Sequence, residues 1–219
     1  MDLEEVWRIR EEEIYPALYG RAVRGIFPLS RDLFRQRFGK ADPDPRWLRH
    51  GVIEFTPTAE RPSWLYVTSG YSNPWDQDPA TYDPEGDSGS GIELMFASTE
   101  QGGWAVDLLQ SLLAFDLLHA AGHYPDQPPP RMGDLIPLRT GINGDPACAL
   151  RGVIMTPAEA APAEFTLPSG RVLMVGFTGV TEAELGYGRR QGPKPLIELL
   201  RAAGAHPVTD PRRTSVVKP

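Results

Sequence analysis

Ser88 is the residue of this 219-residue chain whose setting first points to chemistry, because it lies in the sequence Gly86-Asp87-Ser88-Gly89. Such a sequence is typical of the nucleophile loop of serine proteases, in which a histidine base and an orienting acid activate the hydroxyl. In the chain order of chymotrypsin the base precedes the serine, and His50 is the one histidine that does so. The serine also precedes an expected strand, whereas the nucleophile of an α/β-hydrolase precedes a helix. We therefore favour a tight turn that leads into a strand.

His119 and His123 are four residues apart, which is the spacing of zinc-binding helices. Ala120 stands where a zinc protease has the glutamate that activates water, and the sequence offers no evident third ligand. Gly122 indicates a helix end between the two histidines. The pair is therefore interpreted as the C-terminus of a helix, and no metal and no cofactor are expected.

Composition restricts the remaining classes of function. The formal net charge is −7 and the pI is near 5.2, which argues against a nucleic-acid partner. Cys148, the one cysteine, has no partner for an internal disulfide and is interpreted as an inert core thiol. Residues 1–5 are acidic and lack the features of a secretory signal, so we expect a cytoplasmic protein. Polar residues interrupt the apolar stretch 104–121, which favours a buried helix over a membrane span.

Periodicity and turn residues predict the elements that position these groups. Helices are expected at 2–19, at 104–121, after a capping box at 181–184, and at 194–203. A further helix is expected between a Ser30 cap and Gly39, and Pro16 is expected to end the helix 2–19 early. Strands are expected at 51–56, 64–69, 92–98, 134–138, 150–155 and 172–178. The elements lack βαβ regularity, so we predict a single α+β domain with a central mixed or antiparallel sheet covered by helices.

An acidic loop separates the second and third expected strands. Residues 76–87 carry five carboxylates, two prolines and no Lys or Arg. Trp75 and Tyr82 are interleaved with these carboxylates, and aromatic residues beside charge are typical of protein interfaces. The loop is open to two interpretations, a solvated connection or a recognition surface.

Several blocks of the sequence, taken in order, resemble the suppressor of fused domain. The blocks are 64–72 (WLYVTSGYS), 88–96 (SGSGIELMF), Trp104 with 108–112 (LLQSL), Gly133-Asp134, 175–185 (VGFTGVTEAEL), 196–200 (LIELL) and 208–213 (VTDPRR). The resemblance extends over 42–215. It implies a suppressor of fused-like domain at 42–215, with an N-terminal helical segment at 1–41 packed on it as one globular unit.

The resemblance also implies structural roles for a set of motif residues: Trp64, Gly70, Gly89, Gly91, Glu93, Trp104, Gly133 and Asp134. We expect the glycines at 89 and 91 to adopt backbone conformations that other residues resist, and Glu93 to accept a hydrogen bond inside the sheet. This chain has Ser63 and Leu65 where the family has paired histidines. It is also expected to lack the second half of the animal signalling proteins.

The function implied by the resemblance is non-catalytic protein binding. Stand-alone bacterial-type members are associated with toxin systems, so the resemblance implies an immunity-type protein that neutralises a partner, and an acidic surface suits a basic toxin domain. By analogy with the family, Tyr66, Ser72 and Asp76 are the expected partner contacts. Two alternatives stay open: a small hydrolase that uses Ser88 or a metal at His119 and His123, and a general protein-interaction scaffold.

Overall fold

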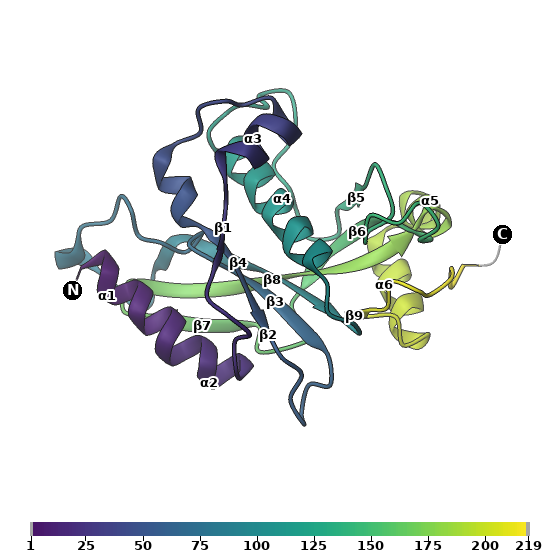
Figure 1. Cartoon of the computed structure of the whole chain (residues 1–219), viewed down its shortest axis with the longest axis horizontal. Helices are drawn as coiled ribbons and strands as arrows, with labels where there is room; N and C mark the ends of the chain where they lie inside the picture. Colours follow the sequence, from purple (N-terminus) through teal and green to yellow (C-terminus); the bar gives the residue numbers. More distant parts are fainter. Residues whose placement is uncertain (1, 218–219) are drawn as a thin grey trace.

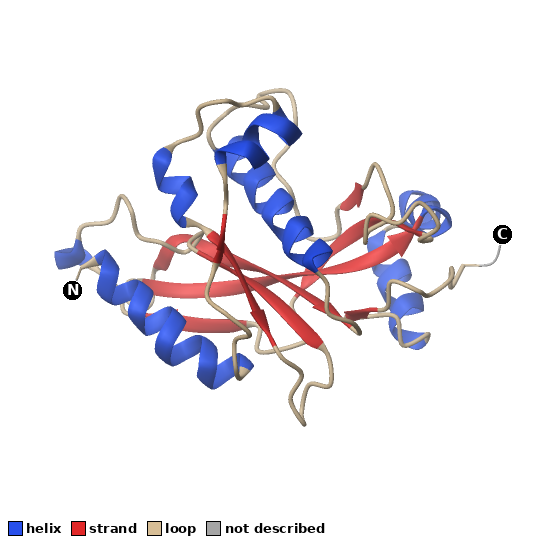
Figure 2. Cartoon of the chain, viewed as in Figure 1, coloured by secondary structure: helices blue, strands red, loops and turns tan. Residues whose placement is uncertain are grey.

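A mixed β-sheet forms the centre of the molecule (Figures 1 and 2). The computed structural model describes residues 2–217, and within them nine strands form one sheet. The strand order is β1-β2-β3-β4-β8-β6-β5, with β7 paired to β8 and β9 paired to β4. β4 runs parallel to β8 and to β9, and the other pairs are antiparallel. Helices cover this sheet, so the predicted α+β class with a mixed sheet is confirmed.

The predicted helices and strands are all present, with ends shifted by a few residues. The strands are β1 (Phe27–Pro28), β2 (Gly51–Phe55), β3 (Trp64–Ser69), β4 (Asp87–Ser98), β5 (Leu135–Pro137), β6 (Leu150–Pro157), β7 (Glu164–Leu167), β8 (Gly170–Thr181) and β9 (Val208–Thr209). The helices are α1 (Leu3–Arg8), η1 (Ile9–Ile14), α2 (Tyr15–Tyr19), α3 (Arg31–Phe38), η2 (Pro45–Arg49), η3 (Pro79–Thr81), α4 (Gly103–Ala120), α5 (Glu182–Gln191) and α6 (Pro193–Ala202). The short strands β1, β7 and β9 carry no sequence signal strong enough to predict.

Two helical layers cover opposite faces of the sheet (Figure 1). α4 packs its leucines on one face, where Phe96 of β4 and Val175 of β8 are buried. The N-terminal helices pack Tyr15 and Tyr19 on the other face, against Phe55 of β2. A third, smaller cluster joins α5 and α6 to Ile154 of β6 and Val180 of β8. The N-terminal segment is therefore one of the two layers that bury the sheet.

The prediction that Pro16 ends the first helix early is wrong, because the helix continues through α1, η1 and α2 to Tyr19. η1 is a π-helical segment, and the Tyr15 amide donates to the carbonyl of Arg10 five residues earlier. In a regular α-helix a proline ring clashes with the carbonyl of the residue four positions earlier. The wider π turn leaves room for the ring.

The tight turn predicted around Ser88 is instead the irregular beginning of β4. Asp87 pairs with Arg171 of β8, and the register shifts before Ile92 pairs with Leu173. Gly89 has a φ of 56° inside this irregular stretch, a conformation that glycine adopts without the steric cost of a side chain. The glycine-serine segment therefore belongs to the sheet.

The described residues, 2–217, contain no helix that is both long enough and apolar enough to span a membrane. α4 is the longest helix, and Asp107, Gln110 and Asp116 interrupt its apolar sequence.

Candidate interaction surface

Glu93 organises the turn in which the chain leaves β3. Its carboxylate is fully buried and accepts hydrogen bonds from the Thr68 hydroxyl (2.5 Å), the Gly70 amide (3.0 Å) and the Ser72 amide (2.9 Å). The Ser72 hydroxyl donates a further bond of 2.7 Å. A buried carboxylate needs several such donors to offset its lost hydration. Glu93 therefore fixes the backbone of residues 70–72 relative to β4.

Arg10 of the N-terminal helix also belongs to this buried cluster. Its side chain is only 1% exposed, and a guanidinium nitrogen lies 3.7 Å from Glu93 Oε1. The guanidinium donates to the hydroxyl of Ser69 (3.0 Å), the hydroxyl of Ser72 (3.1 Å) and Oδ1 of Asn73 (2.8 Å). The guanidinium also pairs with the half-buried Glu11 carboxylate at 3.3 Å. The buried Arg10–Glu93 pair and its hydrogen bonds thus tie the N-terminal helix to the turn after β3.

Two tryptophans lie on the outer side of this cluster. The Trp7 indole donates to Asn73 Oδ1 over 2.8 Å, and its ring meets that of Trp75 edge to face, with centroids 5.8 Å apart. The His50 ring also lies near Trp75, at 6.4 Å between centroids. Aromatic pairs of this geometry are favourable beyond the area that they bury. The turn therefore holds Trp75 in a fixed position.

A groove of about 690 Å³ opens beside the two tryptophans. We call it the tryptophan groove; its lining includes Leu3, Glu4 and Trp7 of α1, Pro45 and Arg49 of η2, and Trp75. Apolar and aromatic groups lie here beside charged ones. Trp and Arg are enriched where proteins bind one another, and pockets of this volume accept short segments or small molecules.

The acidic loop 76–87 is tied at both ends. The Gln77 side chain accepts from the Gly89 amide (2.8 Å) and donates to the Asp87 carbonyl (3.1 Å). Asp76 forms an exposed ion pair with Arg46 of η2 at 3.1 Å, and the Asp78 side chain caps η3. The loop thus has a defined conformation beside η2, with its carboxylates largely in solvent.

The three expected partner contacts do not meet on one surface. Tyr66 and Ser72 are both fully buried, so a partner cannot reach either side chain in this structure. The Tyr66 hydroxyl accepts from the Gly102 amide at the start of α4, and Ser72 belongs to the Glu93 cluster. Asp76 is exposed, and Arg46, with which it forms an ion pair, lines the tryptophan groove.

The remaining motif residues make contacts within the fold. Trp64 packs against the α4 core, and Trp104 meets Phe96 edge to face at 5.6 Å. A Cβ on Gly70 would lie 2.9 Å from His50, and one on Gly91 would lie 3.1 Å from the Asp87 side chain. Gly133 and Asp134 lie in the segment between α4 and β5. The Gly133 amide donates to the Met155 carbonyl, and the Asp134 carboxylate accepts from the Arg131 amide.

Ser88 is fully buried and forms two hydrogen bonds inside the fold. Its hydroxyl donates to the Ser72 carbonyl (2.8 Å) and pairs with the Ser169 hydroxyl (2.6 Å). Neither partner is a base that can activate a nucleophile. The geometry therefore indicates that Ser88 joins the turn to the β7–β8 hairpin.

The histidine pair does not share a helix face, because α4 ends at Ala120 and Gly122 has a φ of 78°. His119 contacts the Gln127 carbonyl over 2.7 Å, and His123 is exposed. Residues 2–217 hold no group of three His, Cys, Asp or Glu side chains arranged to bind a metal ion. Cys148 is buried and donates to the Pro211 carbonyl.

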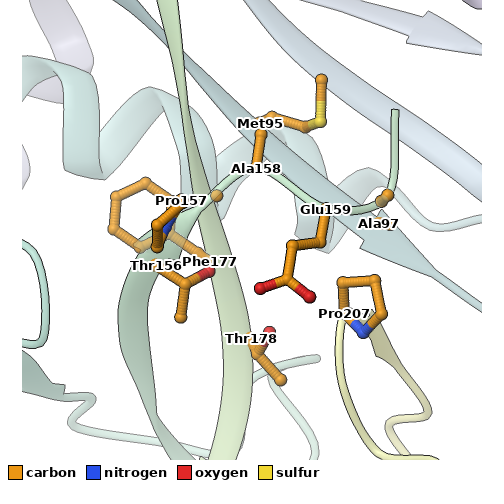
Figure 3. A pocket seen from close by; sticks show the side chains of 11 residues that line it. Met95, Ala97, Thr156, Pro157, Ala158, Glu159, Phe177, Thr178 and Pro207 are labelled. Carbon is orange, nitrogen blue, oxygen red and sulfur yellow. The ribbon is translucent and has the colours of Figure 1, made fainter. Parts of the chain in front are cut away.

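A separate pocket between β6, β8 and the loop after β6 has a volume of only about 10 Å³ (Figure 3). The Glu159 carboxylate and the Thr178 hydroxyl point towards one another across it, with Pro207 alongside. A space of this size corresponds to a single water molecule. It is therefore part of the core rather than a ligand site.

Sequence reasoning missed Arg10, Trp7 and Arg49. A signal for Arg10 was present: it lies four residues after Val6 and four before Ile14, on the stripe that faces the core. A charged residue on such a stripe indicates a buried partner of opposite charge. No comparable pattern marks Trp7 or Arg49, because the groove exists only where separate elements meet.

Stability is expected to fall as the pH drops below neutrality because of two buried histidines. Burial lowers the pKa of His50 below 6.5, although the Glu93 charge opposes this shift and Arg10 reinforces it. Burial likewise lowers the pKa of His206, which faces Glu159 and Arg201. As the pH falls, these histidines therefore bind protons in the unfolded chain before they do so in the folded protein. The stabilisation is complete above the unfolded pKa and is lost as the pH falls towards the folded values, with a slope of up to about 1.4 kcal/mol per pH unit for each histidine.

Urea unfolding followed between about pH 7 and pH 5 measures this slope. A variant with both His50→Gln and His206→Gln removes the two groups and is expected to give a flatter profile. Equal slopes in the parent and the variant would show that other groups control the pH dependence.

A family model described as Suppressor of fused protein (SUFU) matches residues 46–214. Among solved structures, the Sufu-Fu complex is similar with a TM-score of 0.59 and 19% identity, over 87% of this chain and 93% of that chain. Drosophila Suppressor of Fused gives a TM-score of 0.58 and 19% identity, over 86% of this chain and 51% of that chain.

A suppressor of fused homolog from Neisseria gonorrhoeae is also similar. Its TM-score is 0.52 and its identity 18%, over 78% of this chain and 79% of that chain. No curated protein sequence matches this chain. The three solved structures establish a shared fold, and this chain spans about half the length of the Drosophila protein.

Proposed function

Because this chain belongs to the suppressor of fused protein family, we propose that it is a non-catalytic domain that binds another protein. The observation that carries the proposal is the tryptophan groove, where Trp7 and Trp75 pack edge to face beside an exposed arginine of η2. Rigid aromatic anchors next to arginine are typical of the residues that dominate binding energy at protein interfaces.

The related structures support this proposal. One of them is described as a complex of Sufu with Fu, so that Sufu protein has been captured together with another protein. The buried settings of Ser88 and Cys148 give a hydrolase no exposed nucleophile at the positions that the sequence singled out. Protein binding accounts for the groove without a reacting group.

We further propose that the N-terminal segment 1–41 belongs to the same folded unit as the domain at 42–215. The support is the buried contact of Arg10 with Glu93, and the packing of Tyr15 and Tyr19 on the sheet. α1 supplies one wall of the groove, so the proposed binding surface needs both segments.

We also propose an immunity-type role in the cytoplasm, in which the partner is a basic toxin domain. The support is the net charge of −7 and the exposed carboxylates of the loop 76–87, which complement a basic surface and accelerate its capture. Asp76 is the expected contact residue that lies at the groove. A general scaffold would share the groove but show no neutralising effect on a toxin.

The Trp75→Ala variant is expected to weaken binding of the partner by about 30-fold or more, since removal of an interface anchor typically costs 2 kcal/mol or more. The partner is first recovered with the full-length protein from native lysate and identified by mass spectrometry. Its affinity for the parent chain and the variant is then measured by calorimetry. Leu199→Ala, which truncates an exposed side chain on α6, is the matched control.

An affinity for Trp75→Ala equal to that of the control, in a variant that retains its circular dichroism spectrum, contradicts the assignment of the groove. The toxin role has a separate test, in which the chain is co-expressed with the product of the neighbouring gene. Growth that is inhibited equally with and without the chain contradicts the immunity role.

A further inference from the structure

Two charges in the tryptophan groove have no partner within residues 2–217. Glu4 of α1 and Arg49 of η2 are both exposed, and neither forms an ion pair or a side-chain hydrogen bond among those residues. The other charged residues of the groove are engaged. Asp2 accepts from the Glu5 amide as the cap of α1, and Arg46 pairs with Asp44 and with the first carboxylate of the acidic loop.

The groove therefore presents one uncommitted carboxylate and one uncommitted guanidinium on different elements. Leu3, Trp7 and Trp75 supply apolar surface in the same groove. An apolar lining with a few directed polar groups is the usual arrangement of a pocket that recognises one ligand orientation. Opposite charges from two elements define a direction, so that a ligand with matched charges binds better in one orientation than in the other.

The size of the groove restricts the occupant. A volume of about 690 Å³ lies within the range of pockets that take small ligands and a few residues of a peptide. A folded domain that docks as a whole instead needs a broad contact surface, about 800 Å² on each partner. A short segment of a partner, inserted between α1 and η2, fits the groove better.

We propose that the tryptophan groove binds a linear segment of a partner protein that carries an apolar or aromatic anchor between two charges: a basic residue towards Glu4 and an acidic residue towards Arg49. This inference rests on the proposed protein-binding function and adds the chemistry of the bound segment. The anchor packs against Trp7 and Trp75, and the two flanking charges set its direction.

A displayed library of short random linear peptides, selected on the full chain, tests this inference. Enriched peptides are expected to share an apolar anchor with a basic residue on one side and an acidic residue on the other. Selection on Arg49→Glu is expected to replace the acidic preference by a basic one, and selection on Glu4→Lys to replace the basic preference by an acidic one. A peptide enriched on the parent chain is expected to lose about tenfold in affinity for Arg49→Glu, which corresponds to about 1.4 kcal/mol.

Glu198→Lys makes the same net-charge change as Glu4→Lys at an exposed position of α6 and is its control; it is expected to enrich the same peptides as the parent chain. The inference is overturned if no peptide is enriched, if Arg49→Glu and Glu4→Lys enrich the same peptides as the parent, or if the groove proves to be filled by a second copy of the chain in sedimentation experiments. The protein-binding function fails separately, when the parent chain recovers no partner from native lysate. A partner that binds the charge variants as it binds the parent overturns the inference and leaves the function in place.

Discussion

The Arg10→Met variant is expected to lose about 3–5 kcal/mol of unfolding free energy, the usual cost of removing one member of a buried ion pair. Glu93 is fully buried and would keep its charge without the guanidinium that lies 3.7 Å away. The Ser69 hydroxyl would also lose its donor, and Asn73 Oδ1 would keep only the bond from the Trp7 indole. Urea unfolding followed by circular dichroism measures the loss.

Arg8→Met is the matched control, because Arg8 lies on the same helix and pairs with Glu5 and Glu13 in solvent. Exposed pairs of this kind contribute between zero and about 1 kcal/mol. A second variant, Arg10→Met with Glu93→Gln, removes the uncompensated charge and is expected to recover part of the stability lost by Arg10→Met alone. If Arg10→Met and Arg8→Met are equally stable, the buried pair does not hold the N-terminal helix in place.

The Gly89→Ala variant is expected to cost about 2–5 kcal/mol, from two separate causes. Gly89 has a φ of 56°, and a left-handed conformation costs an alanine roughly 1–2 kcal/mol. The added Cβ would also lie 2.4 Å from the carbonyl oxygen of Asn73, so the backbone of the turn must shift, at a typical overpacking cost of about 1–3 kcal/mol. Thermal unfolding with circular dichroism measures the total.

Gly144→Ala separates the two causes. Gly144 has a φ of 80°, yet no atom lies within 4 Å of the position that its Cβ would take. This variant is therefore expected to show only the conformational cost of roughly 1–2 kcal/mol. Equal destabilisation of Gly89→Ala and Gly144→Ala would mean that the turn after β3 does not need the close approach of β4.

The sequence predicted the fold well where the signal is local. The capping box is an example: the Thr181 hydroxyl accepts from the Glu184 amide, and the Glu184 carboxylate accepts from the Thr181 amide. The helix cap at Ser30 and its end at Gly39 are also as predicted. Such features depend on residues a few positions apart, so a single sequence contains the whole interaction.

The candidate surface was predicted only in part, because it depends on which face of an element is buried. Tyr66 was expected to contact a partner, but the strand 64–69 (WLYVTS) is apolar on both faces, and this pattern indicates a strand that is covered on both sides. Asp76 was chosen by the same analogy with the family, and it is exposed at the start of the acidic loop. Trp7 and Trp75 lie far apart in the sequence, so no local pattern indicates that their rings pack together.

The parallel pairing of β4 with β8 also has a consequence for how the chain folds. β4 can form its antiparallel pair with β3 as soon as residues 64–98 are available, whereas its parallel neighbours come from residues 170–181 and 208–209. Until those residues leave the ribosome, β4 presents an open edge of unpaired amides and carbonyls, and such edges favour aggregation. Long-range parallel pairing is slow to form, so we expect β8 to limit the folding rate and chaperones to shield the half-built sheet during synthesis.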